Sequence, residues 1–241
     1  MNLIRAKDYS QLSWQAAKLL AAQVVLKPNC VLGLATGSSP VGTYQELIKS
    51  CRAGGADFSK VKTVNLDEYV GLAPDHPQSY AFFMRDNLFD HINIDLSNTN
   101  IPNGLAEDTD AECARYDEVI RSLGGIDLQL LGLGPNGHIG FNEPEDYFPT
   151  GTHKVALTDA TIQANKRFFS SENEVPRFAL TMGIRDIMQA RQVVMVVSGE
   201  AKAQVVKAAF FGPVTPRVPA SILQLHKHFT LVADEAALSA C

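Results

Sequence analysis

The chain has 241 residues, of which 46% are hydrophobic and 20% are charged. This composition is typical of globular proteins and excludes a disordered or low-complexity chain. The 21 Lys and Arg residues against 26 Asp and Glu residues leave a net charge of −5, which argues against a nucleic-acid partner bound through a basic surface. The longest nearly apolar stretch, Leu19–Leu26, is far shorter than the ~20 residues of a membrane-spanning helix. We therefore predict one domain over residues 1–241, with no nucleic-acid or membrane partner.

The cysteines and the N-terminus bear on the compartment. Cys30, Cys51, Cys113 and Cys241 are scattered without a C-x-x-C pair, which favours reduced thiols over a disulfide framework or a zinc site. The segment Met1–Asp8 lacks the long apolar core of a secretory signal. These features predict a cytoplasmic protein without a metal site.

Hydrophobic periodicity predicts alternating helices and strands. In chain order the predicted elements are a helix over Gln11–Lys27 capped by Asp8 or Ser10, a strand over Cys30–Ala35, a helix over Pro40–Arg52, a strand over Lys62–Leu66, helices over Ser79–Asp90 and Asp108–Leu123, strands over Leu128–Leu133 and Gln192–Ser198, a helix over Glu200–Phe210 and a strand over His228–Ala233. The strand Leu128–Leu133 is apolar except at Gln129, which is typical of a central parallel strand. The alternation predicts an α/β fold whose mostly parallel sheet has helices on both faces. In such folds ligands bind outside the carboxyl ends of the strands.

The first predicted strand is followed by a loop that can bind an anion. Thr36, Gly37, Ser38 and Ser39 precede a helix that begins near Pro40, so three hydroxyls and the free N–H groups of a helix N-terminus converge there. This arrangement favours a phosphate site. An ordinary Ser/Thr cap and turn is the alternative, because the stretch matches neither the Walker pattern nor the dinucleotide fingerprint.

The second predicted strand ends at two adjacent acids, Asp67 and Glu68. If the strand stops at Leu66, Asp67 is placed to act in the cleft as a general base. The alternative is that the two acids form a solvated pair or a cap for the next element.

The third loop, Leu131–Pro144, is rich in glycine and contains His138 and Glu143, five residues apart. A histidine oriented by a carboxylate is the usual design for proton transfer near neutral pH. A single loop histidine can also be incidental, but the glycines and the acid after a buried strand favour function. His138 has no second His or Cys at ligand spacing, which argues against a metal site.

These motifs resemble those of the glucosamine-6-phosphate deaminases, within a superfamily that also contains the 6-phosphogluconolactonases. The stretches that carry the resemblance are Thr36–Pro40, Asn65–Leu72, His76–Tyr80, Gly137–Pro144, Asn165–Phe169 and Ser221–His226. The resemblance implies a Rossmann-like sheet and a hydrolase that converts glucosamine 6-phosphate and water into fructose 6-phosphate and ammonia. It implies no cofactor, because the chemistry needs only proton transfers and phosphate binding.

The resemblance also assigns roles to individual residues. His138 would open the sugar ring, with Glu143 and Asn136 orienting it, and Asp67 would move a proton from C2 to C1. Asn136 departs from family members that have an acid at this position, so Glu143 would be the charged partner of His138. The loop Thr36–Ser39 would bind the phosphate together with two basic residues, Arg167 and Lys202.

Two alternatives remain open at this point. A galactosamine-6-phosphate deaminase would share the chemistry and differ at C4, and a non-catalytic sugar-phosphate sensor would keep the phosphate loop without the acid and the histidine. The resemblance implies a monomer or a small homo-oligomer. Allosterically activated hexamers of the family tend to have longer C-termini, so we expect no activation by N-acetylglucosamine 6-phosphate.

Overall fold

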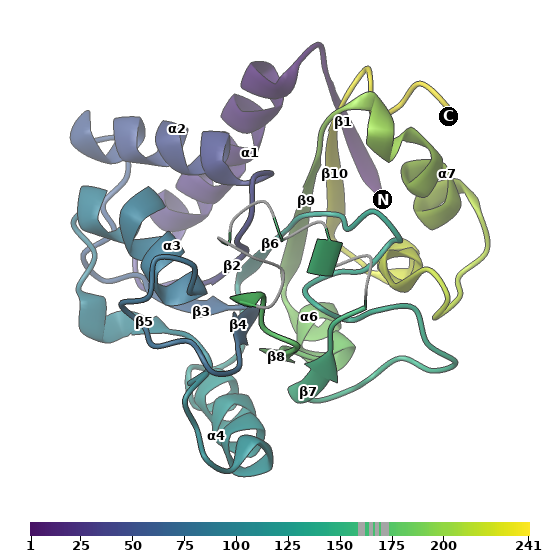
Figure 1. Cartoon of the computed structure of the whole chain (residues 1–241). Coiled ribbons are helices and arrows are strands. Elements are labelled where there is room, and N and C mark those ends of the chain that lie inside the picture. The colour runs from purple at the N-terminus through teal and green to yellow at the C-terminus, as the bar shows by residue number, and fades with distance from the viewer. Residues whose placement is uncertain (159–161, 164–165, 167–168, 170–173) are drawn as a thin grey trace.

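The computed structural model describes residues 1–158, 162–163, 166, 169 and 174–241. Within these ranges it contains a seven-stranded sheet and a separate three-stranded sheet, with helices packed around the larger one (Figure 1). The seven strands lie in the order β1 (Asn2–Ala6), β10 (Phe229–Asp234), β9 (Gln192–Val197), β6 (Leu128–Leu131), β2 (Val31–Leu34), β3 (Lys62–Asn65) and β5 (Thr99–Asn100). Their neighbouring pairs are all parallel. The predicted parallel sheet is therefore confirmed.

Helices cover both faces of this sheet, as predicted. The helices are α1 (Tyr9–Leu26), α2 (Val41–Arg52), α3 (Tyr80–Asn87), α4 (Thr109–Ser122), α6 (Ile184–Gln189) and α7 (Ala203–Phe211), with 3-10 turns at Phe89–His91, Leu96–Asn98, Glu200–Lys202 and Pro219–Leu225. Successive residues of β2 separate onto the two faces: Val31 joins the apolar cluster formed with α4, α6 and α7, whereas Leu32 joins the cluster formed with α1, α2 and α3. This alternation follows from the two-residue period of a strand. Strands β2 and β6 are buried along their whole length.

The smaller sheet is antiparallel and was not predicted. Its strands are β4 (Asp67–Tyr69), β8 (Phe178–Thr181) and β7 (His153–Ala156), in that order. A single residue, Leu66, separates the end of β3 from the start of β4, and Asp67 pairs with Thr181 of β8. The chain therefore leaves the parallel sheet at Leu66 and is immediately held by a second sheet, which places residue 67 at the edge where ligands bind.

Several predicted boundaries need correction. The helix predicted over Ser79–Asp90 ends at Asn87 and continues as a 3-10 turn, and the one predicted from Glu200 starts as a 3-10 turn before α7. Asp8, not Ser10, caps α1, because its side chain accepts a hydrogen bond from the Gln11 N–H at 2.8 Å. The strand β1 was missed.

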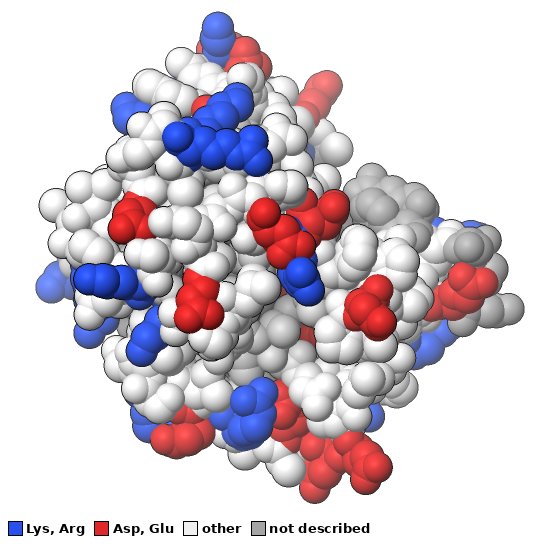
Figure 2. Space-filling view, turned by 90° about the vertical axis from the view of Figure 1, so that its left-hand side faces the viewer, with Lys and Arg blue, Asp and Glu red and all other residues white. Residues whose placement is uncertain are grey.

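The surface and the cysteines complete the description. In the described part of the chain no helix has the length and apolar character to cross a membrane. On the face that Figure 2 shows, acidic and basic side chains are interspersed. The four cysteines are free thiols.

Candidate active site

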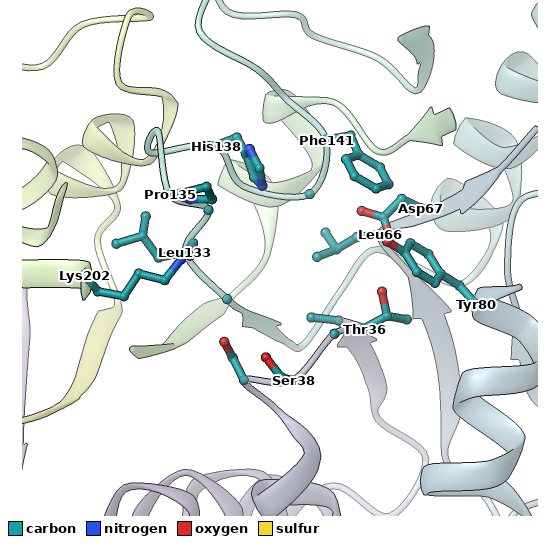
Figure 3. Close-up of a pocket in the computed structure, with 16 residues that line it drawn as sticks. Thr36, Ser38, Leu66, Asp67, Tyr80, Leu133, Pro135, His138, Phe141 and Lys202 are labelled. Atoms are coloured by element: carbon teal, nitrogen blue, oxygen red, sulfur yellow. Dashed lines mark hydrogen bonds between the residues drawn. The ribbon is translucent and has the colours of Figure 1, made fainter. Parts of the chain in front are cut away.

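A cavity of about 490 Å³ lies where strands β2, β3 and β6 end (Figure 3). All three loops that the sequence singled out reach it. Its walls also receive a tyrosine from α3 and a lysine from the turn before α7. The residues that line it are Ala35, Thr36, Gly37, Ser38, Ser39, Leu66, Asp67, Tyr80, Gly132, Leu133, Gly134, Pro135, His138, Gly140, Phe141 and Lys202.

The loop between β2 and α2 is fixed by a tyrosine of α1. The hydroxyl of Tyr9 is within hydrogen-bond distance of the Ser38 and Ser39 carbonyl oxygens, at 3.1 and 3.2 Å, and accepts from the Gly42 N–H at 2.8 Å. Pro40 stands at the N-cap of α2 and supplies no side-chain acceptor. The Gly42 N–H is thus already engaged, but the positive end of the α2 dipole still favours an anion bound in this loop.

Asp67 projects into the cavity from the start of β4 (Figure 3). Its side chain is nearly covered, at 5% exposure. Burial, with the negative charge of Glu68 as a second cause, raises the pKa of Asp67 to about 8. A carboxylate with so high a pKa is a much stronger base than an exposed one.

His138 reaches the cavity only because residue 134 is glycine. A Cβ at Gly134 would lie 2.2 Å from atoms of the His138 ring, and the Gly134 N–H donates to the His138 carbonyl at 3.0 Å. Nδ1 of the imidazole is buried and lies 3.4 Å from Oε2 of Glu143. The edge of the ring that carries Nε2 is therefore the one that faces the cavity.

Asn136 and Glu143 stand behind His138 and do not line the cavity. The Asn136 side-chain amide donates to Oε2 of Glu143 at 2.6 Å, and its carbonyl oxygen accepts from the His138 backbone N–H at 3.2 Å. Asn136 thus fixes Glu143 and the loop, rather than contacting the imidazole of His138 directly. Glu143 is the group that faces the imidazole.

Lys202 lies on the side of the cavity opposite Asp67 (Figure 3). Its ammonium group donates to the Leu133 carbonyl at 2.7 Å, and burial lowers the pKa of Lys202. Asp234 holds the preceding turn, because it accepts from the Ser198 hydroxyl at 2.5 Å and from the Gly199 N–H at 3.1 Å. The other predicted phosphate ligand, Arg167, lies outside the described residues.

Two aromatic residues of the cavity were not predicted as site residues. The rings of Tyr80 and Phe141 are stacked, with centroids 6.0 Å apart and planes 11° apart, and both line the cavity. The available signal was positional: Tyr80 is the first residue after the Ser79 cap, and Phe141 lies in the loop of His138. Together they form an apolar wall beside Asp67.

Comparisons with known proteins identify the family of the chain. The family described as glucosamine-6-phosphate isomerases/6-phosphogluconolactonase matches residues 7–232. A glucosamine-6-phosphate deaminase of Lachnoclostridium phytofermentans is 58% identical over 96% of this chain and 98% of that protein. One from Clostridium perfringens is 54% identical over 98% of both chains.

Solved structures give the same assignment. The structure of a monomeric glucosamine-6-phosphate deaminase superposes with a TM-score of 0.98 at 45% identity, covering 100% of both chains. The 6-phosphogluconolactonase of Trypanosoma brucei shares the fold, with a TM-score of 0.77 at 18% identity over 99% of this chain and 97% of that one. The chain belongs to the glucosamine-6-phosphate isomerase/6-phosphogluconolactonase family.

Proposed function

We propose that this protein converts glucosamine 6-phosphate and water into fructose 6-phosphate and ammonia. The observation that carries the proposal is a single cavity lined by Asp67, His138, the Thr36–Ser39 loop and Lys202, with Lys202 across the cavity from Asp67 (Figure 3). The deaminase names of relatives more than 50% identical over nearly the whole chain support it.

The charge distribution of the cavity orients the substrate. The phosphate binds between the Thr36–Ser39 loop and Lys202, where hydroxyls, helix N–H groups and an ammonium converge. Arg167 adds a second cation in this proposal, on the ground of its place in the family motif alone. The other end of the sugar, with C1 and C2, then lies beside Asp67 and His138. Tyr80 and Phe141 contact the C–H groups of the sugar.

The first chemical step is opening of the pyranose ring. His138 takes the proton of the C1 hydroxyl and delivers a proton to the ring oxygen, which breaks the C1–O5 bond and leaves an aldehyde. Glu143 faces Nδ1 at 3.4 Å and stabilises the imidazolium that forms in between. Asn136 holds the Glu143 carboxylate in place through its 2.6 Å hydrogen bond.

The second step moves a proton along the carbon chain. Asp67 removes the proton from C2, the C2 ammonium group gives one proton to O1, and Asp67 then protonates the resulting enol-amine at C1. The product has a C1 hydroxymethyl group and an iminium at C2. Water adds to C2, and ammonia leaves to give the ketone of fructose 6-phosphate. Each bond that breaks, C1–O5 and then C2–N, breaks with a proton transfer or a water addition, which are steps that acid–base side chains catalyse.

An ammonia-release assay tests this proposal. Purified protein is incubated with glucosamine 6-phosphate and, separately, with galactosamine 6-phosphate, and ammonia is coupled to a dehydrogenase. We expect faster release from the glucosamine compound, and the Asp67→Asn variant should release none. Preference for the galactosamine compound would favour the epimer-specific alternative. Binding of either compound without ammonia release would favour the sensor alternative and refute the proposal.

We further propose that residues 1–241 act as one domain and as a monomer in the cytoplasm. The solved relative that is 45% identical over the full length is described as monomeric, and a phosphorylated sugar is a charged metabolite that membranes retain inside cells. Light scattering during size exclusion should give the mass of one chain. A stable dimer or hexamer, or sigmoidal kinetics that N-acetylglucosamine 6-phosphate makes hyperbolic, would contradict the monomer.

A further inference from the structure

Glu68 is adjacent to Asp67 but faces the other way. The two residues are consecutive in β4, and consecutive side chains of a strand point to opposite faces. Asp67 lines the cavity and Glu68 does not. Glu68 is nevertheless among the most deeply buried charged residues of the described chain, at 2% exposure. A carboxylate that is buried but lies outside the cavity lining needs an explanation that the proton-transfer steps do not give.

The Glu68 carboxylate joins β4 to the N-terminus of α3. Oε1 accepts from the backbone N–H groups of Tyr69 at 2.8 Å and Tyr80 at 2.9 Å, and Oε2 accepts from that of Ala81 at 2.9 Å. Tyr80 and Ala81 are the first two residues of α3, so the carboxylate sits at the positive end of the helix. Burial raises the pKa of Glu68, and these three donors oppose the rise. A site in which both oxygens accept fits the ionised form.

A neighbouring loop seals this carboxylate from solvent. A Cβ at Gly104 would lie 2.1 Å from the Tyr69 carbonyl oxygen and 3.2 Å from Cγ of Glu68, so the backbone approaches closely there. The Gly104 carbonyl also accepts from the Gly71 N–H at 2.8 Å. The charge of Glu68 is therefore little screened by water and acts on nearby groups through protein.

Two consequences reach the cavity. The first is mechanical: Glu68 holds the backbone N–H of Tyr80, whose ring forms part of the cavity wall against Phe141. The second is electrostatic, because a fixed negative charge next to Asp67 opposes ionisation of that carboxyl. The other titratable groups around Asp67 are the hydroxyls of Tyr44, Tyr80 and Tyr116, whose pKa values burial raises, together with His138 and Lys202 of the cavity. Glu68 is the carboxylate among these neighbours.

We propose that Glu68 is a positioning residue that keeps Asp67 strongly basic and fixes Tyr80 in the substrate-binding wall. The part concerning substrate rests on the proposed deaminase function, whereas the part concerning Asp67 does not. Glu68 touches neither substrate nor reacting atoms, and acts through Asp67 and Tyr80.

The decisive variants are Glu68→Gln and Glu68→Asp. Glu68→Gln removes the charge and keeps the shape, so the titration midpoint of Asp67 should fall by on the order of one pH unit. Glu68→Asp keeps the charge but is one methylene too short to reach α3, so the midpoint should stay close to that of the unmodified protein while KM rises several-fold. Glu112→Gln is the matched control, because Glu112 is also buried, accepts from a backbone N–H at 2.7 Å and does not line the cavity.

The midpoint is read without substrate, by carbon-13 NMR of proteins labelled at aspartate carboxyl groups, with Asp67→Asn assigning the signal. This readout remains available if no ammonia is released, so it separates failure of this proposal from failure of the deaminase function. In parallel, the acid limb of kcat/KM should move to lower pH in Glu68→Gln and its plateau should fall, whereas loss of structure alone lowers the plateau without moving the limb. An Asp67 midpoint in Glu68→Gln equal to that of the unmodified protein overturns the proposal. If Glu68→Gln does not fold, Glu68→Asp decides: an unchanged KM there overturns it equally.

Discussion

Replacing Asp67 by asparagine should make the protein more stable and less active at once. The Asp67 carboxyl has a pKa raised from 3.8 to about 8 in the folded chain, mainly by burial, so its ionised form opposes folding. A group of this kind is neutral in both states below about pH 4, and its cost grows as pH rises until it levels off above about pH 8. At pH 7 the cost accumulates over the roughly three pH units between the unfolded pKa of 3.8 and the solution pH, which corresponds to about 4 kcal/mol.

The measurable gain is smaller than this figure for two reasons. The carboxylate lines an open cavity, where the effective dielectric constant is nearer 20 than 4, and the asparagine amide has its own desolvation cost. We therefore expect Asp67→Asn to raise the free energy of unfolding by about 1–2 kcal/mol at pH 8 and by almost nothing at pH 4. Each kcal/mol should raise Tm by about 2–4 °C.

Urea unfolding at pH 4, 6 and 8 measures this gain, with Asp75→Asn on an exposed turn as the control that should show no pH dependence. The same variant should still bind glucosamine 6-phosphate but lose both ammonia release and exchange of the C2 hydrogen with solvent. Equal stability differences at pH 4 and pH 8 would refute the argument about burial. C2 exchange at a near-normal rate would refute Asp67 as the base.

Three further substitutions separate the other roles. His138→Gln should slow ammonia release by ~10²- to 10⁴-fold. In the reverse direction, with fructose 6-phosphate and ammonia, exchange of the C1 hydrogen should suffer less, because this substrate opens more readily in solution. Equal losses in both assays would contradict the ring-opening role. Lys202→Ala should raise KM about 10- to 100-fold through loss of a charge-assisted phosphate contact. Lys207→Ala, which changes an exposed lysine further along α7, should leave KM unchanged. The same KM in both variants would remove Lys202 from the phosphate site. Gly134→Ala places a Cβ 2.2 Å from the His138 ring, so kcat should fall while phosphate binding persists, and an unchanged kcat would show that the imidazole position does not matter.

The fold could be predicted where apolar residues repeat at helical spacing over a long segment, or where a strand is apolar along nearly its whole length. Helix α1 and strand β6 carry their signal within their own residues, because one repeats apolar positions over 18 residues and the other is buried throughout. Strand β1 has no such signal: its five residues include exposed and half-buried positions, and its partner is β10 near the other end of the chain. Strands β4, β7 and β8 were missed for the same reason, since pairing between distant short segments leaves no local pattern.

The site could be predicted because its loops follow strands that end at one edge of a parallel sheet. The structure brings Thr36, Asp67, His138 and Lys202 to one cavity, although their catalytic and binding roles stay predictions. The two interpretations of the acidic pair each apply to one member: Asp67 faces the cavity, and Glu68 caps α3. The sequence could not show which acid has which role, because this depends on where β3 ends and on which way β4 runs.

The opposite surroundings of these two carboxylates explain how a buried acid can serve as a base. Glu68 accepts from three backbone N–H groups, which favour its ionised form, and the charge of that form opposes ionisation of Asp67. Among the described residues that line the cavity, Lys202 is the one lysine or arginine, and it lies on the far side from Asp67 (Figure 3). A positive charge that favours the Asp67 carboxylate arrives with the substrate, whose C2 ammonium group lies next to the hydrogen that is removed. In this arrangement the amine is both the group to be expelled and the counter-ion that activates the base, which ties catalysis to amino sugars more closely than shape complementarity alone would.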